Sequence, residues 1–304
     1  MRKLRVLSYN NGTLDWSFLS QHCVIVTEVE SDFDYALCWK NAPEGIDPGC
    51  IVLFQSEPPL SNLITKTYEY RSSYRAFFCF NPSGDNEYEI TSDPSCYPYK
   101  PAGKLGQSHI YNAVFPRTVF YAGRRSAYMG TPNRFDSINI YPLREKLGQE
   151  IINSQRGCVV GQGWGKETKS VGGGDFRHQK QIDIQACNSG FVLAIENSIL
   201  RNYVSEKIHD GFLSDRVTCY LGAPNIHELI PQGSFVDMMP FVNPEANDID
   251  LDGFFSYIDA LSFADVMSIQ EHAREFRKEA DNRFRNARLE TTKLVLEILS
   301  NNQG

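Results

Sequence analysis

Short, continuous apolar runs separated by turn-rich segments dominate the first third of the chain. The runs are Leu4–Tyr9, Cys23–Val29, Tyr35–Trp39 and Cys50–Gln55. Apolar runs of this length without polar alternation are typical of strands that are buried on both faces, as in parallel sheets. Because parallel strands must be joined by crossover connections, usually helices, the pattern predicts an α/β domain.

A second series of elements begins near Arg117. It follows a stretch over 82–106 rich in Pro, Gly, Ser, Asp and Tyr, which we interpret as an irregular surface segment. We expect strands at Arg117–Tyr121, Cys158–Val160, Phe191–Ile195 and Val217–Leu221, helices at Leu143–Ile152 and Ser205–Leu213, and a glycine-rich loop over Gly161–Lys180. This alternation predicts a second α/β unit. From Leu251 onward the apolar residues recur at helical spacing.

These patterns predict an α/β fold of two Rossmann-like domains that face a cleft, with a helical C-terminal tail. The 304 residues exceed what one compact domain usually holds. We place an N-terminal α/β domain at 1–115, a second Rossmann-like domain at 116–250, and helices that pack on the domains at 251–304.

The charge balance and the cysteines exclude several classes of function. A formal net charge of −7 argues against a nucleic-acid partner. The eight cysteines include no CxxC pair and no Cys/His metal spacing, so they predict neither a zinc site nor a disulfide framework. Only a short apolar stretch follows the basic N-terminus, and no run approaches about 18 apolar residues. We expect a soluble, cytoplasmic protein without a transmembrane segment.

The strand predicted at Phe191–Ile195 ends in the polar residues Glu196–Ser198. Ligands of open α/β sheets bind at this end of the strands. Ser205 is a candidate N-cap for the next helix, whose N-terminus favours a phosphate group. Lys207 adds a full positive charge there, and Glu206 is suited to accept hydrogen bonds from a ribose diol.

Taken together, this segment resembles the donor-binding signature of the α1,3-fucosyltransferases, glycosyltransferase family 10. The signature reads F-E-N-S, Y-[VI]-T-E-K, L-G-x-P and P-x-x-[SA]-F-[IV]. The matching residues here, at matched spacing, are Ile195–Ser198, Tyr203–Lys207, Leu221–Pro224 and Pro231–Val236. The resemblance implies a GT-B type fold with an acceptor-binding N-terminal domain and a GDP-sugar-binding C-terminal domain. The donor-binding residues that it implies are Glu196, Asn197, Tyr203, Glu206 and Lys207.

A second, shorter match concerns the donor diphosphate. Residues 143–147 and 157–161 resemble the family's R-x-x-x-x-x-L helix and the V-D-V-x-G strand that follows it. In that family the arginine contacts the diphosphate, which implies Arg144. The preceding loop is longer than usual, so Arg124, Arg125 and Arg134 are alternatives.

A third match concerns the acceptor side. Residues 53–59 resemble the family's E-S-P/E-x-P element, whose glutamate is thought to act as the base, and this implies Glu57. Glu69, Glu87 and Glu89 are the alternatives if Glu57 is not the base. The acceptor region over 61–104 matches the family poorly, so the resemblance does not identify the acceptor glycan.

The resemblance implies an inverting transfer of L-fucose from GDP-fucose to a glycan hydroxyl, with an α1,3 linkage. A carboxylate can take the proton from the hydroxyl, while Lys207 and Arg144 can stabilise the leaving diphosphate. Two cations and a helix N-terminus can replace a divalent ion, so we expect neither a metal nor a cofactor. Asp248–Asp250 and Asp250–Asp252 fit a DxD pattern, but we interpret them as residues of a polar loop.

Two other functions remain open at this stage. The signature describes the nucleotide and the diphosphate more than the sugar, so a related transferase with a different GDP-sugar is one alternative. A noncatalytic relative that kept the fold and binds a sugar or a protein partner is the other.

Overall fold

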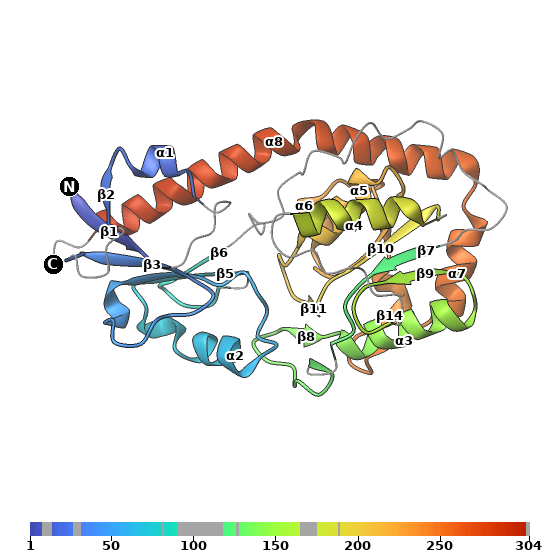
Figure 1. Ribbon diagram of the computed structural model, residues 1–304, viewed down its shortest axis with the longest axis horizontal. Helices are drawn as coiled ribbons and strands as arrows, with labels where there is room; N and C mark the ends of the chain where they lie inside the picture. Colours follow the sequence, from blue (N-terminus) through green and yellow to red (C-terminus); the bar gives the residue numbers. More distant parts are fainter. Residues whose placement is uncertain are drawn as a thin grey trace.

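The computed structural model describes residues 1–7, 14–26, 32–80, 82–89, 118–125, 128–164, 175–187 and 189–301. Two parallel sheets, each packed against helices, and one long C-terminal helix make up this part of the chain (Figure 1). None of the helices described is long and apolar enough to cross a membrane.

The first sheet has the strand order β2-β1-β3-β4-β5-β6, and every neighbouring pair is parallel. Its strands are β1 (Arg2–Val6), β2 (Cys23–Val26), β3 (Tyr35–Trp39), β4 (Ile51–Phe54), β5 (Ala76–Cys79) and β6 (Glu87–Glu89). The helices α1 (Trp16–Leu19) and α2 (Asn62–Glu69) belong to the same half of the chain. Trp39, Phe54 and Phe78 stack across neighbouring strands, with ring centroids 5.1 and 4.4 Å apart.

The second sheet has the order β13-β12-β10-β7-β9, and it is also parallel throughout. Its strands are β7 (Thr118–Tyr121), β9 (Gly157–Val160), β10 (Phe191–Ile195), β12 (Val217–Leu221) and β13 (Val236–Asp237). The helices that accompany it are α3 (Tyr141–Asn153), α4 (Asp175–Ala186), α5 (Glu206–Leu213), α6 (Ile226–Leu229) and α7 (Leu251–Ala260). Two small antiparallel pairs join β8 (Ile138–Asn139) to β11 (Ser198–Ile199) and β14 (Val242–Asn243) to β15 (Asp248–Ile249).

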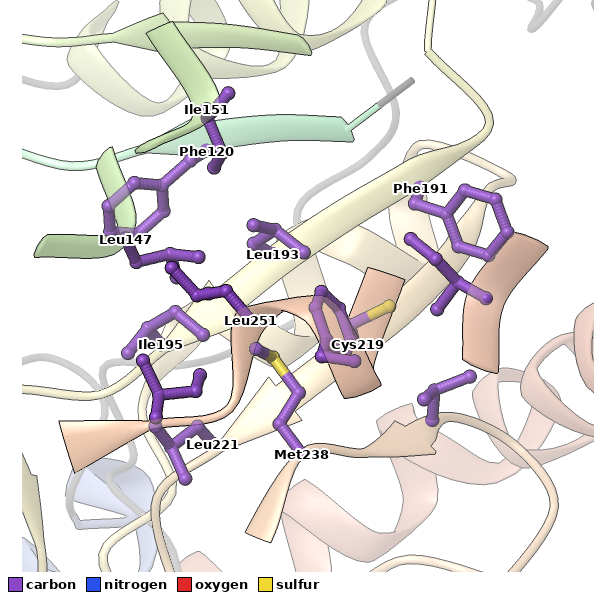
Figure 2. Close-up of a cluster of buried hydrophobic side chains, with 14 of the residues drawn as sticks. Phe120, Leu147, Ile151, Phe191, Leu193, Ile195, Cys219, Leu221, Met238 and Leu251 are labelled. Carbon is purple, nitrogen blue, oxygen red and sulfur yellow. The ribbon is translucent and has the colours of Figure 1, made fainter. Parts of the chain in front are cut away.

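One face of the second sheet forms the largest apolar core. Figure 2 shows Phe120, Leu193 and Cys219 from three neighbouring strands together with Leu147 from α3 and Leu251 from α7. All five side chains are buried. The strands are mostly apolar on both faces because α3 and α7 cover this face while α4 and α5 cover the other.

The order of the second sheet fixes where a ligand can bind. β7 is the first of its strands along the chain, and the chain next adds β9 on one side and β10 on the other. The direction of winding therefore reverses between β7 and β10. In open α/β sheets the crevice beyond the carboxyl ends of the strands at such a reversal is the usual ligand site.

The C-terminal helix α8 (Phe263–Ser300) connects the two halves of the molecule. Its 38 residues correspond to about 57 Å of helix. Near its start, Ala273 and Phe276 pack in an apolar cluster with α5 and β12, and near its end Ile298 and Leu299 pack on the first sheet. Figure 1 shows α8 running along one side of the molecule from one sheet to the other.

Several expectations are confirmed and three are wrong. The strands Tyr35–Trp39, Phe191–Ile195 and Val217–Leu221 have the predicted bounds. The loop predicted over 161–180 is wrong from Asp175 onward, where the polar residues form the start of α4. Residues 165–174 of this predicted loop lie outside the described part of the chain.

The second wrong expectation is the irregular segment over 82–106. Residues 87–89 form β6, which pairs with the open edge of β5, and residues 90–106 lie outside the described residues. The third is the polar loop at Asp248–Asp250. Asp248 lies in β15 and pairs with Lys146, and Asp250 caps α7 by accepting a hydrogen bond of 2.9 Å from the backbone N–H of Gly253.

Candidate functional site

A cleft of about 390 Å³ lies where the carboxyl edges of the two sheets meet. From the first sheet, Lys40 follows β3 and Glu57 follows β4. From the second sheet, Arg125 follows β7 and Asn197 follows β10. The further residues that line it include Tyr128, Tyr141, Arg144, Lys180, Tyr203, Ser205, Glu206 and Lys207. The cleft thus includes the position at which the winding of the second sheet reverses.

A fully buried carboxylate stands behind the cleft. Glu196 is 0% exposed at the end of β10. Its Oε1 accepts a hydrogen bond of 2.6 Å from the backbone N–H of Ser205, and its Oε2 accepts one of 2.5 Å from the Ser205 hydroxyl and one of 3.1 Å from Lys207. A buried carboxylate needs such partners. Gly222 makes room for it, since a Cβ there would lie 2.4 Å from Cγ of Glu196.

Lys207 is the cation that links this carboxylate to the cleft. Its side chain is 14% exposed, and its ammonium lies 3.1 Å from Glu196 and 3.7 Å from Glu206. Burial by itself lowers the pKa of Lys207, but the charges of Glu196 and Glu206 outweigh burial and raise the pKa above its ordinary value. Lys207 therefore remains charged at neutral pH.

The N-terminus of α5 opens into the same cleft. Ser205 is its N-cap, as the sequence predicts, and its hydroxyl accepts hydrogen bonds from the backbone N–H of Lys207 at 3.5 Å and from the Lys207 ammonium at 2.8 Å. Ser205, Glu206 and Lys207 all line the cleft. The N-terminus of α5 thus favours a bound anion, because it combines free N–H groups, the helix dipole and the ammonium group of Lys207.

Arg144, in the first turns of α3, is 5% exposed and lines the cleft. Its Nη1 donates hydrogen bonds to the backbone carbonyl of Glu196, at 3.4 Å, and to Oδ1 of Asn197. Asn197 in turn donates to the Tyr203 hydroxyl at 3.3 Å. Burial lowers the pKa of Arg144, although a guanidinium stays charged at neutral pH. The structure therefore brings together all five predicted donor-site residues of the second sheet with Arg144.

Lys180 is a cleft residue that the sequence does not reveal. It lies on α4, is 5% exposed and pairs with the buried Asp210. Its ammonium also lies 3.8 Å from Glu206 and 5.3 Å from the centre of the Tyr121 ring. No motif marks this lysine, since it stands in the polar segment that the glycine pattern predicts as loop. The packing of α4 against α5 and β7 places it in the site.

Glu57 is the carboxylate that the first sheet contributes to the lining. Its side chain is 35% exposed, and Oε1 lies 3.3 Å from the Lys40 ammonium. The alternative bases do not line the cleft: Glu69 pairs with Arg134, Glu87 pairs with Arg71, and Glu89 lies exposed on β6. Glu57 and the α5 N-terminus thus line the same cleft.

Within the ranges that the structure describes, no group of three or more His, Cys, Asp or Glu side chains is arranged to hold a metal ion. The charged groups of the cleft are mainly cations. Two carboxylates, Glu57 and Glu206, stand among five cations, which are Lys40, Arg125, Arg144, Lys180 and Lys207. Such a cleft suits a negatively charged ligand next to a neutral hydroxyl-bearing one.

Comparison with known proteins gives two kinds of match. Residues 143–251 match the family model of the glycosyltransferase family 10 (fucosyltransferase) C-terminal domain. An α-(1,4)-fucosyltransferase of Arabidopsis thaliana is 25% identical over 151 residues, which are 42% of this chain and 36% of the plant protein. The chain thus spans just over a third of the length of this curated relative.

The fold is similar to solved structures. An α1,3-fucosyltransferase with GDP-fucose has a TM-score of 0.54 at 13% identity, over 88% of this chain and 81% of that one. An α1,3-fucosyltransferase with GDP has a TM-score of 0.53, also at 13% identity, over 92% and 89% of the two chains. These matches show an α/β fold with parallel sheets that is similar to those structures.

Proposed function

We propose that this chain, whose residues 143–251 are a glycosyltransferase family 10 (fucosyltransferase) C-terminal domain, transfers L-fucose from GDP-fucose to a hydroxyl group of a glycan. One observation carries the proposal. A cationic site at the N-terminus of α5, formed around Lys207 and Arg144, shares a single cleft with the carboxylate of Glu57. A transferase needs these two functions, one for the leaving group and one for the nucleophile.

The donor is proposed to bind on the second sheet. The diphosphate would lie at the α5 N-terminus, where Lys207 and Arg144 supply positive charge. Glu206 would accept hydrogen bonds from the ribose diol, and Asn197 and Tyr203 would orient the donor. The two relatives with solved structures that hold GDP-fucose and GDP support this choice of nucleotide.

We also propose the GT-B arrangement, with domains at 1–115 and 116–250 and a helical tail at 251–304. Two parallel sheets with the cleft at their carboxyl edges support it, as does the packing of α8 on both halves. The acceptor would then lie against the first sheet, near Glu57.

The proposed reaction is a direct displacement with inversion. A bond forms between the acceptor oxygen and C1 of fucose while the bond from C1 to the diphosphate oxygen breaks, and the electron pair leaves with GDP. Glu57 takes the proton of the acceptor hydroxyl. Lys207 and Arg144 stabilise the charge that grows on the diphosphate. The proposed linkage is α1,3, and an α1,4-linked product would contradict this part of the proposal alone.

Metal independence is part of the proposal, and the five cations that line the cleft support it. Transfer by the full chain should therefore survive EDTA largely intact. Complete loss of activity with rescue by manganese or magnesium would show that a divalent ion, rather than the cations of the cleft, neutralises the diphosphate.

Nucleotide choice tests the donor assignment. GDP should raise the melting temperature more than UDP or CMP does at the same concentration, since stabilisation by a ligand grows with the logarithm of its concentration relative to Kd. Equal shifts with UDP would contradict the assignment. Hydrolysis of other GDP-sugars in preference to GDP-fucose would favour the alternative donor. GDP binding without transfer to any member of a glycan array would favour a noncatalytic role.

We also propose that the protein is cytoplasmic. The cysteines that the structure describes are all free, which supports a reducing compartment. Fractionation of cells that express the protein tests this location, and recovery with secreted proteins would contradict it.

A further inference from the structure

Among the residues that the structure describes, Arg125 differs from the other charged groups of the cleft in its lack of a hydrogen-bond or ion-pair partner. It is exposed on the segment that follows β7 and lines the cleft. Its side chain makes no hydrogen bond and no ion pair with any residue that the structure describes, whereas Lys40 pairs with Glu57, Lys180 with Asp210 and Lys207 with Glu196.

The other arginines near β7 and α3 are engaged elsewhere. Arg124 pairs with Glu145 and lies 5.6 Å from the centre of the Trp164 ring. Arg134 pairs with Glu69 at 3.3 Å, and neither arginine lines the cleft.

Arg144 does line the cleft, but part of its guanidinium is already used. Nη1 donates to Asn197 and to the carbonyl of Glu196, and the guanidinium lies 4.7 Å from the centre of the Tyr141 ring. Burial lowers the pKa of Arg144, and the charge of the nearby Arg125 contributes in the same direction. A bound anion stabilises two neighbouring guanidinium groups whose charges repel each other.

We propose that Arg125 binds the diphosphate of the donor directly, together with Lys207 and Arg144, an inference that rests on the proposed function. The ammonium groups of the cleft already have carboxylate partners, and in the described residues Arg125 and Arg144 have none. These two guanidinium groups balance a diphosphate, which carries one negative charge on each phosphate.

The position and chemistry of Arg125 suit this role. It lies beyond the carboxyl end of β7, one of the two strands between which the winding reverses, and it lines the same cleft as the α5 N-terminus. An exposed guanidinium offers its donors in a planar fork that fits two phosphate oxygens. Because the diphosphate gains charge as it leaves, Arg125 also contributes to turnover.

The experiment compares the affinities of GDP and GMP for the full chain by titration calorimetry. Arg125→Ala should weaken GDP binding about ten-fold, equal to about 1.4 kcal/mol, and should change GMP binding less because GMP has no β-phosphate. Arg125→Lys should recover part of the loss, since a lysine keeps the charge without the fork. Arg134→Ala is the matched control because it removes the same charge outside the cleft, and its GDP affinity should stay within about two-fold.

If the wild-type chain binds GDP and Arg125→Ala binds it equally well, this inference is overturned and the proposed function is not. A higher KM for the glycan acceptor with an unchanged Kd for GDP would also overturn it, because Arg125 would then serve the acceptor. A wild-type chain that binds no GDP would overturn the proposed function and this inference together.

Discussion

At the scale of single residues, Lys207 carries the donor side of the proposed mechanism. Lys207→Ala removes a charge-assisted contact worth about 1.5–3 kcal/mol, so GDP affinity should fall ten-fold or more. The melting temperature should fall as well, because Glu196 is 0% exposed and loses its charged partner. Calorimetry with GDP and a thermal melt measure the two effects. Lys146→Ala, which removes an exposed lysine outside the cleft, should change neither.

The raised pKa of Lys207 fixes the pH dependence of this contact. A lysine whose folded-state pKa lies above the unfolded value stabilises the fold fully below the unfolded pKa, and that contribution is lost as the pH rises through the folded one. Lys207 thus stays charged through neutral and mildly alkaline pH. GDP affinity should be flat between about pH 7.5 and 9. A decline across that window that disappears in Lys207→Ala would contradict the raised pKa of Lys207.

Glu57 carries the acceptor side. Glu57→Gln keeps the shape of the side chain but removes the base, so transfer should fall by about 10²–10⁴-fold. GDP affinity should stay near that of the wild type, because Glu57 belongs to the first sheet and contacts Lys40 rather than the donor-site cations. Glu69→Gln is the matched control. A near-normal rate for Glu57→Gln would remove Glu57 from the mechanism.

At the scale of elements, the end of β12 decides whether the buried carboxylate fits. A Cβ on Gly222 would lie 2.4 Å from Glu196 and 2.4 Å from the hydroxyl of Tyr220. Gly222→Ala should therefore lower stability by about 1–3 kcal/mol, measured by chemical denaturation, and should weaken GDP binding by displacing the partner of Lys207. Gly130→Ala, where a Cβ would meet nothing within 4 Å, should do neither. If both variants behave alike, the position of Glu196 does not depend on Gly222.

The elements of the donor site were predictable because each depends on local sequence. β10 and β12 are continuous apolar runs, and Ser205 is a polar cap directly before a helix. β6 and α4 were not predictable in this way. β6 is short and polar and forms because β5 offers it an open edge, while α4 has few apolar residues and follows a glycine-rich segment. The placement of Lys180 and Arg125 in the cleft depends on packing between distant segments.

At the scale of the whole molecule, neither half makes a complete site. The first sheet supplies Glu57 and Lys40, and the second supplies the other four cations and the α5 N-terminus. The distance between these groups depends on how the two sheets are held. Helix α8 packs on both, through Ala273 and Phe276 near its start and through Ile298 and Leu299 near its end. We therefore expect α8 to influence transfer although none of its described residues lines the cleft.

The last turns of α8 provide the test of this coupling. Leu299 is 1% exposed and packs with the buried side chains of the first sheet, so Leu299→Ala should lower stability by about 2–5 kcal/mol. Lys293→Ala is the control on the same helix, since its side chain is 50% exposed and pairs only with Glu290.

A more specific measurement than overall stability is whether Leu299→Ala loses transfer or GDP binding first on heating. Leu299 packs on the sheet that carries Glu57, whereas the proposed GDP contacts belong to the other sheet. Transfer should therefore be lost at a lower temperature than GDP binding, followed in parallel by product formation and by nucleotide titration. At 25 °C, where the variant remains folded, its Kd for GDP should match that of Lys293→Ala. Simultaneous loss of both functions would mean that the two sheets unfold as one unit. Weaker packing of α8 on the first sheet would then not affect that sheet alone.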